Sequence, residues 1–109
     1  MLKKNILRRK RDFSAVYNKG KFVREKYIVL FYRKNDLSYN RIAFLASKKV
    51  GNSVKRNRAR RLMKESVRTS GEPGFSGYDL IFIARNTINN RKCADVKESI
   101  EAAIKKVEI

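Results

Sequence analysis

The sequence predicts a single α+β domain, and three observations support this prediction. Residues 21–34 and 78–85 are rich in β-branched and aromatic side chains, which favours strands over helices. Residues 53–68 and 94–109 instead carry apolar side chains at helical spacing. The chain has 109 residues, of which 42% are hydrophobic, so it can form one small core and has no room for a second domain.

The N-terminal residues 1–11 are basic and weakly patterned, so we expect a partly flexible arm. The residues that follow place Phe13, Val16 and Tyr17 at i, i+3 and i+4, with Gly20 just beyond, which predicts a short helix. Aromatic residues in such a helix usually belong to the core. Basic residues flank these rings, however, and this combination suits single-stranded nucleic acid, whose bases stack and whose phosphates pair. Both interpretations stay open at this point.

Residues 21–34 form the first predicted strand. Alternation along it places Tyr27, Val29 and Phe31 on one side of the sheet, while the other side is also apolar. Both faces should therefore be covered, one by packed protein, and the other could form the floor of a groove. A short polar link leads to a second strand within residues 41–50, which we expect to run antiparallel to the first.

Residues 48–68 are strongly basic and contain a single acid, Glu65. Gly51, Asn52 and Ser53 supply a turn followed by an amide or a hydroxyl that can cap the first free N–H groups, so we expect a helix to start near Ser53. At about 100° of rotation per residue, a polar and cationic stripe forms opposite small and apolar residues. The stripe comprises Asn57, Arg61, Lys64 and Arg68, and the opposite side comprises Ala59, Leu62, Met63 and Ser66.

Two interpretations of this cationic stripe compete. Most charge runs are solvated helix faces, but like charges at i+3 and i+4 repel each other, and compensating acids are missing here. The whole chain has 28 Lys and Arg against 10 Asp and Glu, a formal net charge of +18, which favours a phosphate-bearing partner. Anionic lipid is a weaker candidate, because the helix lacks the bulky apolar face that interfacial binding favours.

A glycine-rich connector, residues 71–77, ends the basic helix. The almost uninterrupted apolar strand 78–85 follows, and it suits a central position in the sheet. A strand, a helix and a strand in succession predict a parallel crossover, which is normally right-handed. In the C-terminal helix, Asp95 and Glu98 are expected to form a capping box at its start. Its apolar stripe comprises Val96, Ile100, Ile104 and Val107.

The chain lacks the side chains on which most protein catalysts depend. It has no histidine, and its single cysteine, Cys93, can form neither an internal disulfide nor a thiolate metal cluster. The carboxylates are scattered over different predicted elements, which disfavours a self-sufficient nuclease. No secretory leader is evident, and the longest apolar run is far shorter than the ~20 residues of a membrane span. We therefore expect a cytoplasmic binding protein with no metal of its own.

Residues 47–62, which read SKKVGNSVKRNRARRL, resemble the RNR region of the bacterial ribonuclease P protein component. The order of the predicted elements around this region is also similar to that family. The resemblance implies a cytoplasmic subunit that joins a catalytic RNA, needs no obligate protein partner and promotes removal of the 5′ leader from precursor tRNA. The RNA and Mg²⁺ would carry out the hydrolysis, so no protein residue would be catalytic and no metal would be bound tightly by the protein.

The resemblance also implies a fold. It is an α-β sandwich of order αβββαβα, like domain 2 of ribosomal protein S5, with a mixed four-stranded sheet. The crossover through the basic helix would be left-handed, against the general rule, and residues 21–24 would form an extra short strand.

Two sets of binding residues follow from the resemblance. Arginine suits a folded RNA because its planar fork pairs two phosphate oxygens, and aromatic rings hold a single strand by stacking without demanding a sequence. The residues expected at the RNA subunit are Lys48, Lys49, Asn52, Arg56, Asn57, Arg58, Arg60, Arg61, Lys64 and Arg68. Those expected at the leader of precursor tRNA are Phe13, Tyr17, Lys19, Tyr27 and Phe31. The alternatives are a ribosomal or general RNA-chaperone protein, a DNA-binding basic helix, and a stand-alone nuclease.

Overall fold

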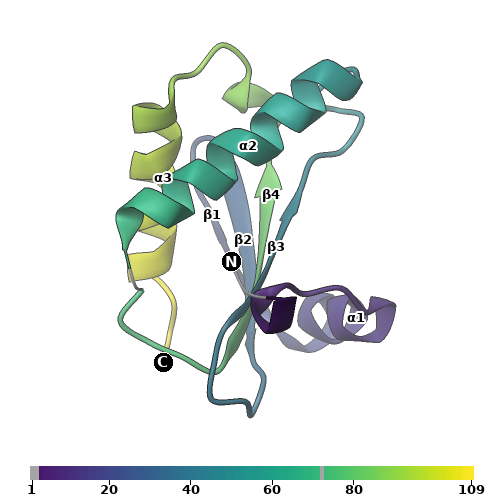
Figure 1. The fold of residues 1–109 in the computed structure, drawn as a ribbon, viewed down its shortest axis with the longest axis vertical. Coiled ribbons are helices and arrows are strands. Elements are labelled where there is room, and N and C mark those ends of the chain that lie inside the picture. The colour runs from purple at the N-terminus through teal and green to yellow at the C-terminus, as the bar shows by residue number, and fades with distance from the viewer. Residues whose placement is uncertain (1–2, 72) are drawn as a thin grey trace.

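The computed structural model describes residues 3–71 and 73–109. Helices lie on both faces of a mixed four-stranded sheet, which confirms the α+β prediction (Figure 1). Residues 21–34 form two strands, as the resemblance implies. The elements are η1 (Lys3–Asn5), α1 (Lys10–Lys19), β1 (Lys21–Arg24), β2 (Ile28–Lys34), β3 (Arg41–Leu45), α2 (Ser53–Ser70), β4 (Tyr78–Ala84), η2 (Asn86–Ile88) and α3 (Cys93–Lys105).

The strands lie in the order β1-β2-β4-β3. β2 pairs antiparallel with both β1 and β4, whereas β3 pairs parallel with β4. β2 and β3 therefore run antiparallel, as predicted, but they are not neighbours, because β4 lies between them. Six of the seven residues of β4 are buried, and the central position removes both of its faces from water.

The crossover from β3 through α2 to β4 is left-handed. In Figure 1 both strands run upward, α2 crosses in front of the sheet, and β4 lies to the left of β3. The right-handed expectation from the general rule is therefore wrong, and the expectation from the resemblance is confirmed. The left-handed path places the apolar β4 between β2 and β3, where it pairs along both edges. A right-handed path over this face would instead place β4 on the far side of β3, where β3 would be its one neighbour.

Alternation along the strands divides the core into two clusters. Leu30 and Phe82 belong to the larger cluster, which α2 and α3 cover. Phe31 and Ile81 face the other way and pack in a smaller cluster with Val16 of α1. The sheet thus separates two layers of helix, and each layer carries a different part of the surface described below.

Near the two ends of the chain, the structure refines two of the predictions. α3 begins at Cys93, so Asp95 is the third helical residue and does not precede the helix as the predicted capping box required. Its carboxylate still accepts the N–H of Lys92, at 3.1 Å, and so satisfies one free donor at the helix start. Within the predicted arm, Leu7 is 3% exposed and donates its N–H to the carbonyl of Ile42, at 3.0 Å.

Candidate nucleic-acid interface

The start of α2 is fixed by its own residues. Asn52 caps the helix by accepting the N–H of Lys55 at 3.0 Å, so the cap is the amide and not the hydroxyl of Ser53, between which the sequence left the choice open. Gly51 adopts a φ of +141°, and a Cβ at this position would meet the side chain of Lys55. Because only glycine takes up this conformation without strain, the turn sets where the basic helix begins and how it is rotated.

The rotation of α2 places its cations away from the core. Ala59, Met63 and Ser66 are buried, which confirms the predicted inner side of the helix. Asn57 and Arg61 are exposed on the outer side and line one hollow beside β3. The stripe continues through Lys64, which lines this hollow and the next, to Arg68 at the second hollow.

Most of the cations on this side have no acid to neutralise them. Within residues 3–71 and 73–109, Arg60, Arg61 and Lys64 form no ion pair with a carboxylate. Arg68 is different, because it forms an exposed ion pair with Glu65. This hydrogen-bonded pair raises the pKa of Arg68 and lowers the pKa of Glu65. Arg60 hydrogen-bonds the side chain of Asn57, which orients a guanidinium without reducing its charge.

Two of the predicted cations, Arg56 and Arg58, lie on opposite flanks of the helix instead of on its outer side. The guanidinium of Arg58 donates to the backbone carbonyl of Arg91 at 2.6 Å and so ties α2 to the loop before α3. Arg56 is half-buried and donates to the hydroxyl of Ser53 at 3.3 Å. Lys48 and Lys49 are exposed in the turn that leads to α2.

On the other side of the sheet, aromatic rings form a continuous row. Phe13 and Tyr17 of α1 lie 6.5 Å apart between ring centroids, and Tyr17 meets Phe31 of β2 edge-on at 5.1 Å. Tyr17 is 40% exposed, and its partial burial raises the pKa of its hydroxyl. Lys19 is exposed at the end of α1. Three of the predicted leader-binding rings are therefore brought together.

Phe22 extends this row and was missed by the sequence analysis. It lies opposite Phe31 in the β1–β2 ladder, with 5.5 Å between the ring centroids, and it is 63% exposed. The signal that could have found it is the cross-strand pair, since antiparallel neighbours lie on the same face. That pair is visible only once residues 21–34 are divided into a hairpin.

Tyr27 does not belong to this row, and its predicted position is wrong. It precedes the first residue of β2, so strand alternation does not govern its direction. It packs against the larger core cluster, with Lys26 and Arg91 over its ring at 5.9 and 5.5 Å. The ring therefore lies on the side of the sheet opposite to Phe31.

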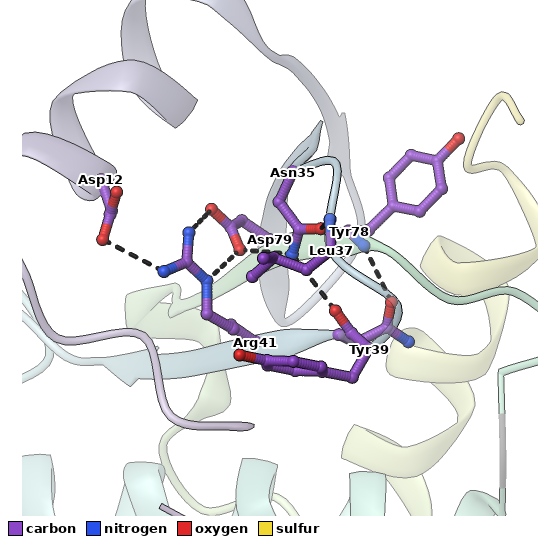
Figure 2. A network of polar contacts seen from close by, with 8 residues as sticks. Asp12, Asn35, Leu37, Tyr39, Arg41, Tyr78 and Asp79 are labelled. Atoms are coloured by element: carbon purple, nitrogen blue, oxygen red, sulfur yellow. Dashed lines mark hydrogen bonds and ion pairs between the residues drawn. The ribbon is translucent and has the colours of Figure 1, made fainter. Parts of the chain in front are cut away.

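A cluster around Arg41 holds α1 in place beside the sheet (Figure 2). The fork of Arg41 donates to both carboxylate oxygens of Asp79, each at 2.8 Å, and its remaining nitrogen reaches Asp12 of α1 at 3.2 Å. Asn35 donates to the same Asp79 at 2.9 Å. Asp79 has a side chain only 5% exposed, and the hydrogen bonds it accepts raise the pKa of Arg41. The helix that carries Phe13 and Tyr17 is thus anchored by a bidentate ion pair.

The described part of the chain contains neither a metal-binding cluster nor a membrane-spanning helix. In these residues, no three side chains of His, Cys, Asp or Glu gather where they could hold a metal ion. Among residues 3–71 and 73–109, no helix is both long and apolar enough to pass through a membrane.

A small α+β domain with an unneutralised cationic helix face and a row of partly exposed aromatic rings belongs to the class of nucleic-acid-binding proteins. Comparison with known proteins makes this more specific. The family model described as Ribonuclease P matches residues 1–108, and the chain belongs to this family. Binding the RNA subunit of ribonuclease P and processing precursor tRNA are the role of the family.

Curated relatives and solved structures agree with this assignment. The ribonuclease P protein component of Clostridium botulinum is 41% identical over 109 residues, covering 99% of this chain and 98% of its own. That of Pelotomaculum thermopropionicum is 38% identical, covering 96% and 94%. The RNase P protein from Thermotoga maritima superimposes with a TM-score of 0.85 at 27% identity, covering 95% of this chain and 98% of its own. The Staphylococcus aureus RNase P protein gives 0.82 at 26% identity, covering 93% of each chain.

Proposed function

We propose that this chain acts as the accessory protein subunit of a ribonucleoprotein endoribonuclease, in which the RNA performs the cleavage. In this proposal the protein binds the catalytic RNA through α2 and the 5′ leader of precursor tRNA through the aromatic row. Mg²⁺ would be held by the RNA, which supplies the phosphate oxygens that this ion prefers. The protein would work in the cytoplasm without an obligate protein partner.

The observation that carries the proposal is the outer side of α2. It bears cations that face away from the core, and all of them except Arg68 have no carboxylate partner in the described chain. Cations held this way on one helix repel each other, and RNA phosphates would relieve this repulsion while releasing counterions. The surface assigned to the RNA subunit comprises Lys48, Lys49, Asn52, Asn57, Arg60, Arg61, Lys64 and Arg68, with Arg56 and Arg58 on its flanks.

The aromatic row supports a different kind of contact. Tyr17 and Phe22 expose large parts of their rings, and Phe31 lies between them. A base stacked on such a ring contributes about 1–3 kcal/mol with little dependence on its identity, which suits a leader of variable sequence. Lys19 stands at the end of α1, where it can reach a phosphate of the same strand. Phe13 completes the row from its half-buried position.

Reconstitution tests the proposal directly. The purified full chain is mixed with the ribonuclease P RNA of its source at low Mg²⁺, and removal of the leader from a precursor tRNA is measured. We expect the protein to stimulate cleavage, since it adds cations that substitute for missing Mg²⁺. Equal binding to unrelated folded RNAs without stimulation would instead identify a general RNA chaperone. Cleavage without the RNA subunit would identify a stand-alone nuclease.

A further inference from the structure

A hollow of about 800 Å³ runs along the open edge of β3. β3 is the last strand of the sheet, so only one of its edges is paired with a full neighbouring strand. One wall of the hollow is the outer side of α2, its floor is β3 itself, and its far wall is formed by Ile6, Leu7 and Phe13. Its volume lies in the range of sites that hold small ligands.

The hollow combines an apolar interior with a cationic rim. Phe44 and Leu45 of β3 line the interior, and Phe44 is already stacked on Phe82, with ring planes 19° apart. Arg60, Arg61 and Lys64 stand on the α2 side. A flat ring with a phosphate attached matches both features, because the ring can continue the stack while the phosphate meets the guanidinium groups.

The backbone of β3 adds polar groups to the floor. The carbonyl of Ile42 accepts the N–H of Leu7 at 3.0 Å, so the backbone groups of Ile42 point to the outer edge. In a parallel strand, groups pointing to one edge recur at every second residue. Phe44 is the next such residue, and its N–H and carbonyl therefore point into the hollow, where they can pair with the polar edge of a base.

We propose that this hollow receives one unpaired nucleobase extruded from the RNA subunit. The inference rests on the proposed function and deepens it, because it adds a base-specific contact to a surface otherwise defined by phosphate binding. An added peptide strand is the competing occupant of an open sheet edge. The structure favours RNA for two reasons. Cations without a carboxylate partner border the hollow, and Leu7 already hydrogen-bonds the backbone of Ile42, which an added strand would need.

The test fills the hollow without removing charge. Val54 lies on the rim of the hollow and is 75% exposed, so Val54→Trp should fold normally while its ring competes with the base. Thr69→Trp is the matched control, since Thr69 is exposed on the same helix and does not line the hollow. Urea denaturation of both variants checks that each is folded. We expect Val54→Trp to weaken assembly with the RNA subunit about tenfold, the scale of one lost base stack, and Thr69→Trp to change it by less than about twofold.

A second arm identifies the base. A photo-crosslinking residue replacing Val54 should mark one nucleotide of the RNA subunit, and an abasic substitution at that nucleotide should weaken assembly of the wild-type chain about tenfold. The same abasic RNA should bind Val54→Trp with no further loss of affinity, because both changes remove the same contact. Arg61→Ala should still weaken the abasic complex.

Three results would overturn the proposal. The first is an RNA affinity of Val54→Trp equal to that of the wild type, and the second is crosslinks spread over many nucleotides. The third is a loss of affinity for the abasic RNA with Val54→Trp that equals the product of the two separate losses. The first result would leave an added peptide strand as the remaining candidate for the β3 edge. If the wild-type chain failed to bind the RNA subunit at all, the proposed function itself would fall, and this inference with it.

Discussion

Two regions of the molecule use arginine in opposite ways. Around Arg41 the guanidinium is largely buried and both of its neighbours are carboxylates, Asp79 and Asp12. On the outer side of α2, Arg61 is exposed and lacks a carboxylate partner in the described chain. In the first arrangement the carboxylates pair with arginine and hold the fold together. In the second the positive charge stays available to a partner. Net charge alone does not separate these two uses, whereas the local distribution of carboxylates does.

The strongest test of this contrast is stability. Arg41→Ala should lower the free energy of unfolding by about 3–5 kcal/mol, because it leaves Asp79 buried without its partner. Arg61→Ala should change it by less than about 0.5 kcal/mol, as exposed substitutions usually do. Urea denaturation measures both values. Arg41→Lys serves as the control, since it keeps the charge but loses the bidentate fork, and it should fall between the two.

Equal destabilisation by Arg41→Ala and Arg61→Ala would contradict the contrast between the two regions. It would mean that the outer side of α2 contributes to the fold as much as the buried cluster does. A stable Arg41→Ala protein would have a different meaning, namely that Asp12 and Asp79 find other partners among the many cations of the chain.

The sequence predicted the elements of both regions but only one of the two roles of arginine. The cationic side of α2 follows from spacing within a single helix, which a sequence displays directly. The pairing of Arg41 with Asp79 requires β3 and β4 to be parallel neighbours in a register that places these two residues side by side. Periodicity reports which face of a strand is buried, but it does not report which strands are adjacent.

The aromatic row shows the same limit. The resemblance assigned Phe13, Tyr17 and Phe31 to the leader, and their positions could be predicted because each lies within a regular helix or strand pattern. Tyr27 was misplaced because it lies just outside a strand, where alternation no longer applies. Phe22 was missed because its partner is on another strand. The left-handed crossover followed from the resemblance to a family and not from the residue pattern, for which the general rule gave the wrong hand.

The aromatic row is an uncharged surface, so its contacts should respond differently from those of arginine. Tyr17→Ala should weaken binding of a leader-bearing precursor tRNA to the assembled enzyme by about 1–3 kcal/mol, the value of one stacked base. This loss should depend little on salt, because no phosphate contact is removed. Binding measured with and without a leader, at two salt concentrations, checks both points. A loss of the same size with leaderless tRNA would contradict the assignment.

Phe13→Ala is the internal comparison for Tyr17→Ala. Phe13 packs in the smaller core cluster, so its truncation should lower both leader affinity and the free energy of unfolding. Tyr17 is more exposed, and its truncation should mainly affect the leader. If Phe13→Ala destabilises the fold without changing leader affinity, the ring belongs to the core alone.

The third prediction concerns the outer side of α2 itself. Arg61→Ala should weaken assembly with the RNA subunit and reduce the dependence of log affinity on log salt by about 1, as expected for one lost phosphate contact. Lys105→Ala on α3 is the matched control for loss of one positive charge elsewhere, and its salt dependence should stay close to that of the wild type. Arg58→Ala should behave differently from both, since it also breaks the hydrogen bond to Arg91 and should lower stability by about 1 kcal/mol. An unchanged salt dependence in Arg61→Ala would show that this side chain does not meet a phosphate.

The smallest expected effect comes from the one acid on the basic helix, Glu65, which occupies Arg68 in the free protein. Glu65→Gln should therefore tighten assembly with the RNA subunit by about two- to fourfold at low salt, because Arg68 no longer exchanges one anion for another. Glu98→Gln removes the same charge from α3 and should have a smaller effect.

The pKa of Glu65 is lowered by Arg68, so the ion pair persists at neutral pH and is lost only as the pH falls below the ordinary carboxyl range. The advantage of Glu65→Gln over wild type should accordingly disappear in acid, where protonation of Glu65 releases Arg68 in the wild type too. An advantage that persisted in acid would mean that Glu65 acts on the RNA directly and not through Arg68.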